Sequence, residues 1–251
     1  MEHKSVIIEK REEIGFLILN HPETSNLLNE ELFKGISRTL EELNADDEVR
    51  LIIVKGAGDN FCMGGDVARI LTLDKLERRD FFHGLIKMYQ TFHEIDKPSI
   101  AMVHGYATAG GMGIVSSCDL AVASEDACFG FTAVNVGLFC MSGTAVMLPR
   151  VVGGKKALEV GLTGQIINAK DAEKLGIVNM VCPKKELEPA TMELAQRILS
   201  KNPISIVMGK RNFYTCADME YDKALEHSAE MFGVLAATEE AKERMRAFLA
   251  K

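Results

Sequence analysis

The chain contains two glycine-rich loops, Phe61-Cys62-Met63-Gly64-Gly65-Asp66 and Gly105-Tyr106-Ala107-Thr108-Ala109-Gly110-Gly111-Met112-Gly113. Each follows a strand-like run, and the second leads into a segment with a helical pattern. Glycine permits positive φ and leaves backbone N–H groups open, so two such loops can aim two N–H groups at one point as an oxyanion hole. The loops can equally be tight turns and helix–sheet contacts. A dinucleotide fold is a third interpretation, although the glycines do not match GxGxxG properly.

The segments around these loops predict an α/β fold. Strand-like runs occupy residues 5–9, 14–20, 50–55, 98–103 and 119–123. Amphipathic helical patterns occupy residues 30–43 and about 76–95, and Asn29 can cap the first of them. The second of these helices carries His83, Tyr89 and His93. The repeated order strand, strand, helix, with glycines in the connecting loops, favours an α/β architecture.

The composition changes near residue 185, because only Gly209 and Gly233 of the 21 glycines follow it. Helical patterns then occupy residues 187–200, 203–215, 218–236 and 238–250. Pro203 fits a first-turn position, and Thr238 can cap the last helix. We therefore predict a core over residues 1–185 and a C-terminal helical region over residues 186–251.

Bulk properties exclude several classes of protein. The formal net charge is −7 and the chain lacks a basic stripe, which argues against a nucleic-acid partner. Residues 98–118 and 127–149 carry no charged side chain, but their frequent small and polar residues indicate buried strands and turns, not membrane helices. The six cysteines form no CxxC pair, so we expect free thiols. The first residues show no signal-peptide pattern, so we expect a cytoplasmic protein.

The motifs together resemble the crotonase (enoyl-CoA hydratase/isomerase) superfamily, in order and spacing, over nearly the whole chain. They include Asn26-Leu27-Leu28-Asn29, the two glycine loops, Cys118-Asp119-Leu120-Ala121-Val122-Ala123 and Ala172-Glu173-Lys174-Leu175-Gly176-Ile177-Val178. The resemblance implies a crotonase-type spiral of ββα turns with a C-terminal α-helical oligomerisation region, assembled as a homotrimer or a dimer of trimers. It also implies an acyl-CoA thioester as substrate, as in fatty acid metabolism. Coenzyme A would be part of that substrate, with no separate cofactor or metal.

The resemblance assigns roles to individual residues. The N–H groups of Gly65 and Gly110 would form the oxyanion hole that stabilises an enolate of the thioester. Four residues would contact coenzyme A: Leu27 on the pantetheine path, Met63 through its carbonyl near the adenine, Asp66, and Lys251 at the 3′-phosphate of a neighbouring subunit.

The chain departs from the family at its acid–base positions. Hydratases hold and deprotonate water with two glutamates, but these positions are Gly113 and Ala133 here, and a third carboxylate position is Met141. Polar side chains near the expected pocket are Thr132, Asn135, Cys140 and Ser142, of which Asn135 and Cys140 are our tentative catalytic residues. Asp119 is interpreted as the start of a structural strand.

Three functions remain open. The first is a hydratase-like lyase or isomerase in which Asn135 or Cys140 positions water, and the whole-chain resemblance favours this expectation. The second is a CoA-thioester decarboxylase, which needs an oxyanion hole but no general base. The third is a non-catalytic acyl-CoA-binding protein, for which the loss of both glutamates is the simplest evidence.

Overall fold

The computed structural model describes residues 5–140 and 143–250 of the chain. Within these residues, six strands form the larger sheet in the spatial order β1-β2-β3-β4-β6-β9. They are β1 (Val6–Arg11), β2 (Ile14–Leu19), β3 (Leu51–Gly56), β4 (Ser99–Val103), β6 (Leu120–Ser124) and β9 (Met180–Cys182). Within this larger sheet, β1 and β2 pair antiparallel, and each of the following neighbouring pairs is parallel.

In the same part of the chain, three short strands form a second sheet in the order β5-β7-β8. They are β5 (Tyr106–Thr108), β7 (Cys128–Gly130) and β8 (Ile166–Asn168). The first glycine loop follows β3, and the second contains β5 and follows β4. Because β3 and β4 are parallel neighbours, both loops leave the larger sheet at the same edge.

Helices cover both faces of the larger sheet. Those before the C-terminal region are α1 (Glu30–Ala45), α2 (Val67–Thr72), α3 (Lys75–Glu94), α4 (Gly110–Ser117), α5 (Gly143–Val152), α6 (Gly154–Thr163) and α7 (Ala169–Lys174). The C-terminal helices are α8 (Leu187–Leu199), α9 (Pro203–Ala217), α10 (Tyr221–Ala236) and α11 (Glu239–Leu249). Three 3₁₀ turns are also described, η1 (Pro22–Thr24), η2 (Thr132–Val136) and η3 (Lys184–Glu186).

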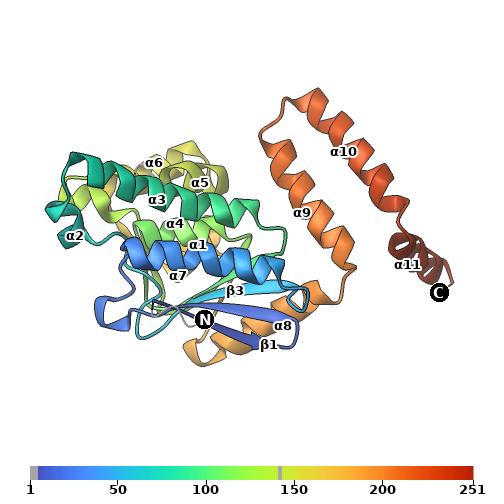
Figure 1. Cartoon of the computed structure of the whole chain (residues 1–251), viewed down its shortest axis with the longest axis horizontal. Helices are drawn as coiled ribbons and strands as arrows, with labels where there is room; N and C mark the ends of the chain where they lie inside the picture. The colour runs from blue at the N-terminus through green and yellow to red at the C-terminus, as the bar shows by residue number, and fades with distance from the viewer. Residues whose placement is uncertain (1–4, 141–142, 251) are drawn as a thin grey trace.

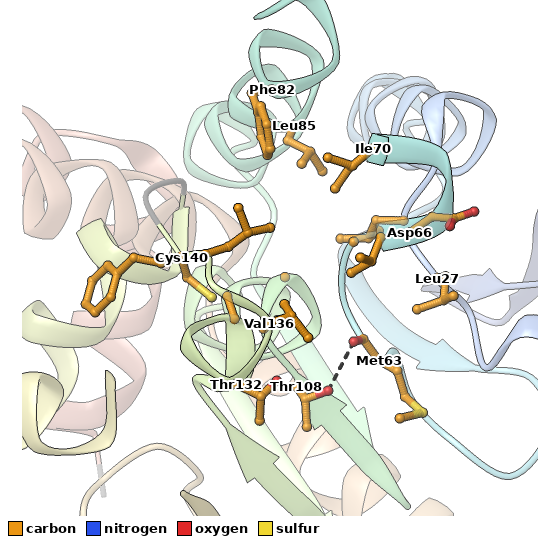
Figure 2. A pocket seen from close by; sticks show the side chains of 18 of the residues that line it. Leu27, Met63, Asp66, Ile70, Phe82, Leu85, Thr108, Thr132, Val136 and Cys140 are labelled. Carbon is orange, nitrogen blue, oxygen red and sulfur yellow. Dashed lines mark hydrogen bonds between the residues drawn. The ribbon is translucent and has the colours of Figure 1, made fainter. Parts of the chain in front are cut away.

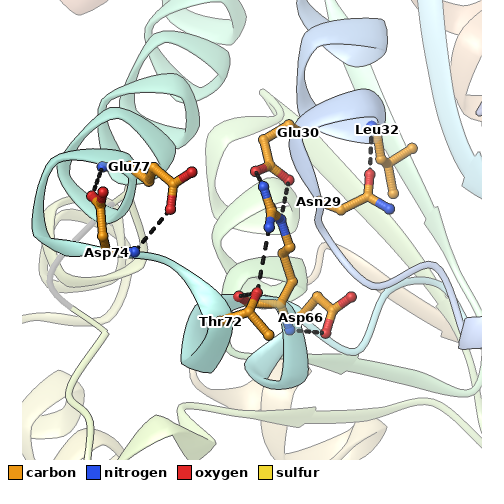
Figure 3. Close-up of polar contacts among 8 residues, drawn as sticks. Asn29, Glu30, Leu32, Asp66, Thr72, Asp74 and Glu77 are labelled. Atoms are coloured by element: carbon orange, nitrogen blue, oxygen red, sulfur yellow. Dashed lines mark hydrogen bonds and ion pairs between the residues drawn. The ribbon is translucent and has the colours of Figure 1, made fainter.

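Local side-chain contacts explain where the helices beside the first loop begin. The Asn29 side chain accepts the Leu32 N–H and caps α1, as predicted. At the start of α3, the Asp74 carboxylate accepts the Glu77 N–H, and the Glu77 carboxylate accepts the Asp74 N–H, a capping box (Figure 3). These caps satisfy N–H groups that have no partner inside the helix.

The core lies on both faces of the sheet because alternate residues of a strand point to opposite sides. Leu17 and Leu19 of β2 join the cluster under α1, α3 and α4, whereas Phe16 and Ile18 join the cluster covered by α8. All residues of β2 are buried. This explains why the strands are continuous hydrophobic runs and not alternating patterns.

The α/β prediction is confirmed, and the predicted strands and helices match the observed ones within a few residues. One expectation was partly wrong: the uncharged segments contain α4 and much of α5 besides strands and turns. Gly111–Ser117 of α4 are all buried, so this helix has no polar face to mark it in the sequence. No helix of the described residues is long and apolar enough to cross a membrane.

The C-terminal helices differ in how they contact the core. Leu187, Ala195 and Leu199 of α8 are buried against the sheet, so the compositional boundary near residue 185 precedes a helix that packs with the core. By contrast, none of the residues of α9, α10 and α11, all within the described part of the chain, is buried. These helices extend away from the body of the molecule (Figure 1).

One polar cluster joins α9 to the core. The Asp119 carboxylate accepts hydrogen bonds from the Ser99 N–H and hydroxyl and from the Tyr214 hydroxyl, and it pairs with Lys210 at 2.8 Å. Asp119 is therefore a structural residue at the start of β6, as its position in the sequence indicated.

Candidate functional site

A cavity of about 870 Å³ opens beside the two glycine loops. Apolar side chains form most of its wall, and they come from α2, α3, η2 and the segment after η2 (Figure 2). The lining residues used below are Leu27, Met63, Gly65, Asp66, Phe82, Tyr89, Thr108, Gly110, Ala133 and Cys140. Of the residues assigned to the site from the sequence, the structure therefore brings seven to one cavity: Leu27, Met63, Gly65, Asp66, Gly110, Ala133 and Cys140.

The two glycines predicted to form the oxyanion hole, Gly65 and Gly110, both line this cavity. Gly110 is the first residue of α4, where an N–H has no partner within the helix. Gly65 forms a parallel bridge with Leu28, in which the Leu28 N–H donates to Gly64 and the Asp66 N–H donates to Leu28. In such a bridge the N–H of the central residue points away from its partner strand. Both glycines can thus offer an N–H to a ligand.

The two glycine loops contact each other at Gly64 and at Ala109–Gly110. A Cβ on Gly64 would lie 2.7 Å from the Ala109 Cβ and 3.0 Å from the Gly110 nitrogen. Gly64 also has φ +96°, so only glycine satisfies both the contact and the conformation. The approach of the two loops is therefore built into the sequence at this position.

Ala109 supplies a strained turn directly before the α4 N–H groups. Its φ is +47° and its ψ is −113°, a conformation that alanine rarely adopts. Three hydrogen bonds hold it: its N–H donates to Gly130 at 2.7 Å, and its carbonyl accepts from Thr144 Oγ1 and from the Gly113 N–H. Strain held in this manner is typical of functional sites.

The residues expected to contact coenzyme A all line the cavity, apart from Lys251. The Met63 carbonyl accepts a hydrogen bond from the Thr108 hydroxyl at 3.1 Å (Figure 2), and a carbonyl oxygen can accept a second one. Asp66 caps α2 by accepting the Arg69 N–H. Arg69 in turn pairs with Glu30 of α1, which fixes the α2 wall (Figure 3). Lys251 lies outside the described residues, as do Met141 and Ser142.

Gly113, predicted to be the first vacant glutamate position, is crowded by two neighbouring side chains. A Cβ on Gly113 would lie 2.6 Å from Thr144 Oγ1 and 2.7 Å from the Tyr89 hydroxyl oxygen, so Thr144 and Tyr89 occupy the space next to this position. Tyr89 is 7% exposed, and its hydroxyl donates to the Gly110 carbonyl at 2.9 Å. Ala133, at the second position, is half-buried in η2 and lines the cavity.

Of the two tentative catalytic residues, only Cys140 lines the cavity. Burial raises the pKa of its thiol to about 11, so the thiol is neutral near pH 7. Asn135 is not among the described lining residues, and its amide donates to the Gly164 carbonyl at 3.0 Å. The η2 turn directs the Asn135 side chain toward Gly164, while Thr132, Ala133 and Val136 line the cavity, and a water-positioning role for Asn135 stays a prediction.

Tyr89 is the site residue whose role the sequence did not reveal. It lies on α3 with Phe82, Leu85 and Ile86, and these four positions follow the i, i+3, i+4, i+7 spacing of one helical face. That spacing was the available signal. The histidines of α3 are exposed: His83 is not among the described lining residues, and His93 contacts the Tyr214 ring.

Comparisons with known proteins agree with this geometry. The family model described as enoyl-CoA hydratase/isomerase matches residues 9–251. A crotonyl-CoA hydratase of Syntrophomonas wolfei is 34% identical over 100% of this chain and 97% of its own length, and a short-chain-enoyl-CoA hydratase of Clostridium acetobutylicum is 33% identical with the same coverage. The solved structure of an enoyl-CoA hydratase from Mycobacterium smegmatis superposes with a TM-score of 0.95 at 31% identity, covering 98% of this chain and 96% of that one. The chain is a member of the enoyl-CoA hydratase/isomerase family, in the crotonase superfamily.

Proposed function

We propose that the protein binds an acyl-CoA thioester in this cavity and polarises its carbonyl without hydrating an enoyl group. The thioester oxygen would lie between the N–H groups of Gly65 and Gly110. Support comes from the cavity beside these glycines and from the relatives, whose names describe them as hydratases of enoyl-CoA esters. The observation that carries the second half of the proposal is the position of Tyr89 where a glutamate at 113 would lie.

Hydration needs a group that takes a proton from water and another that returns one. Among the described lining residues, Asp66 is the single carboxylate, and it caps α2 (Figure 2). Cys140 has too high a pKa to act as a base near neutral pH. The cavity therefore supports carbonyl polarisation better than it supports transfer of a proton to or from water.

Decarboxylation is the second candidate. The described cavity wall contains no lysine, arginine or histidine, so a malonyl-type carboxylate would lose its hydration without gaining a cationic partner. Loss of CO₂ would relieve this penalty, and the resulting enolate would be stabilised by the two N–H groups.

A matched pair of variants tests the proposal. The Gly65 site has room for a methyl group, since the nearest neighbour of an added Cβ is Ile70 Cδ1 at 3.5 Å. Gly65→Ala keeps the N–H, whereas Gly65→Pro removes it. We expect Gly65→Ala to bind acyl-CoA like the parent, and Gly65→Pro to bind about threefold to tenfold more weakly, as one net hydrogen bond predicts.

Binding is measured by calorimetry with butyryl-CoA and with free coenzyme A, and circular dichroism confirms that each variant is folded. The same proteins are incubated with crotonyl-CoA and methylmalonyl-CoA, and products are identified by mass spectrometry. Hydration of crotonyl-CoA by the parent would overturn the proposal. Release of CO₂, reduced about 10²–10³-fold in Gly65→Pro, would establish the second candidate.

We further propose that α9, α10 and α11 pack against other copies of the chain. They expose large aromatic side chains, including Phe213, Phe232 and Phe248, which are 69%, 72% and 78% exposed in the single chain. Sedimentation equilibrium tests this, and a monomer at micromolar concentration would contradict it.

A further inference from the structure

Two glycines on separate helices make room for the Tyr89 ring. A Cβ on Gly143 of α5 would lie 2.4 Å from Tyr89 Cγ, and the three nearest atoms all belong to that ring. A Cβ on Gly113 of α4 would lie 2.6 Å from Thr144 Oγ1, 2.7 Å from the Tyr89 hydroxyl oxygen and 2.9 Å from Tyr89 Cε1. The ring therefore packs closely against both α4 and α5, and neither position accepts a larger residue while the ring is there.

The Tyr89 hydroxyl fixes the ring beside the carbonyl-polarising groups. It donates to the carbonyl of Gly110, one of the two glycines whose N–H groups are proposed to polarise the thioester. An ideal Cβ on Gly110 would lie only 3.2 Å from the same hydroxyl. Tyr89 thus borders the space directly next to the thioester carbonyl, where the first carbons of an acyl group would lie.

We propose that Tyr89 is a specificity-determining residue, which restricts the ligand to acyl groups that are unbranched next to the thioester. This inference rests on the proposed function, since it names the class of acyl-CoA that the site takes. A rigid ring held from two sides cannot withdraw from a substituent on the first or second carbon. The wall farther along α3, formed by Phe82, Leu85 and Ile86, leaves an apolar path for the rest of a straight chain.

Three isomeric ligands provide the test: valeryl-CoA, isovaleryl-CoA and pivaloyl-CoA, which differ only in where the acyl chain branches. Their dissociation constants are measured by calorimetry on the full chain. We expect the parent to bind valeryl-CoA most tightly. In Tyr89→Ala, the affinity for pivaloyl-CoA relative to valeryl-CoA should rise by about tenfold or more, because the freed space admits and buries the methyl groups on the carbon next to the thioester.

Three control variants separate the ring from other effects. Tyr89→Phe keeps the ring and should keep the parent's order of preference. Phe82→Ala removes an aromatic ring from the same face of α3, seven residues or about 10 Å away, and should change the ratio by less than about threefold. Tyr89→Leu replaces Tyr89→Ala if the latter does not fold.

A double-mutant cycle checks the position of the ring without any ligand. Gly143→Ala should lower the melting temperature by about 5 °C or more in the parent, but by much less in a Tyr89→Ala background. The control is Gly154→Ala in α6, where an added Cβ meets nothing within 4 Å. It should have the same small effect in both backgrounds.

The outcomes distinguish the two proposals. If the parent binds none of the thioesters, the proposed function fails, whatever the cycle shows. If the parent binds them and folded Tyr89→Ala retains its preference among the isomers, the function stands and the role of Tyr89 is overturned.

Discussion

Removal of the Asp119 carboxylate should be among the most damaging single changes outside the cavity. Asp119 and Lys210 form an ion pair at 2.8 Å, with side chains that are 16% and 8% exposed. Asp119 also accepts hydrogen bonds from the Ser99 N–H, the Ser99 hydroxyl and the Tyr214 hydroxyl. In Asp119→Ala, the Lys210 ammonium keeps the Lys97 carbonyl at 2.9 Å as an acceptor but loses its counter-charge. Breaking such a buried pair lowers the free energy of unfolding by about 3–5 kcal/mol.

Lys210→Met should be milder, because an apolar side chain replaces the cation while Asp119 keeps its three other donors. We expect it to lower the free energy of unfolding by less than half as much as Asp119→Ala. The matched surface control is Asp80→Ala, which breaks an ion pair with Arg79 whose side chains are 63% and 68% exposed. Asp80→Ala should lower the free energy of unfolding by less than about 1 kcal/mol.

The assay is guanidinium-induced unfolding followed by circular dichroism, at one protein concentration for all variants. Limited proteolysis adds a second readout, since Lys210 and Tyr214 lie on α9 and their release should expose the segment between α8 and α9. A loss below about 1 kcal/mol in Asp119→Ala, with unchanged proteolysis, would refute the view that this cluster anchors α9.

Three further outcomes follow from the site and the core. Alkylation of Cys140 by iodoacetamide should be slow at pH 7 and rise about tenfold per pH unit toward its pKa near 11, and bound acyl-CoA should suppress it, as mass spectrometry can show. Alkaline conditions should destabilise the fold: burial raises the pKa of the Cys62 thiol from 9.0 to about 12, so the folded state holds its proton more tightly. The contribution of the protonated Cys62 thiol to the free energy of unfolding is complete below pH 9 and is lost as the pH rises toward 12. Urea unfolding at a series of pH values measures this loss. Ala109→Val should lower the free energy of unfolding by more than about 2 kcal/mol because a β-branched residue resists positive φ, while Ala109→Gly should change it by less than about 1 kcal/mol in the same unfolding assay.

Much of the fold could be predicted because local physical chemistry decides it. Asn29 and Thr238 cap the helices that they were expected to cap, and Pro203 begins α9. These signals work because a cap acts within three residues of its own position. The α4 helix was harder to recognise, because burial on all sides removes the polar–apolar alternation on which helix prediction depends.

The site was only partly predictable for a related reason. Gly64 leaves a mark in the sequence because its φ of +96° restricts the residue type. Gly65 and Gly110 have no positive φ, and their oxyanion-hole roles, taken from the family resemblance, stay predictions. The Asn135 side chain contacts Gly164 while its neighbours Thr132, Ala133 and Val136 line the cavity, because a 3₁₀ turn directs neighbouring side chains differently, so proximity in sequence does not ensure proximity to the cavity. Tyr89 fills a space created by absent side chains on two other helices, and such a relation appears only once the helices are packed.

The order of strands in the larger sheet has a consequence for how the protein is made. Successive neighbours β1, β2, β3, β4 and β6 appear in the same order along the chain, with the β5-containing loop between the last two. A nascent chain emerges from the ribosome N-terminus first, so each new strand finds its partner already present. Both glycine loops are complete once Ser124 has emerged, roughly halfway through translation. The rest of the described cavity wall, up to Cys140, also emerges long before α9, α10 and α11 are synthesised.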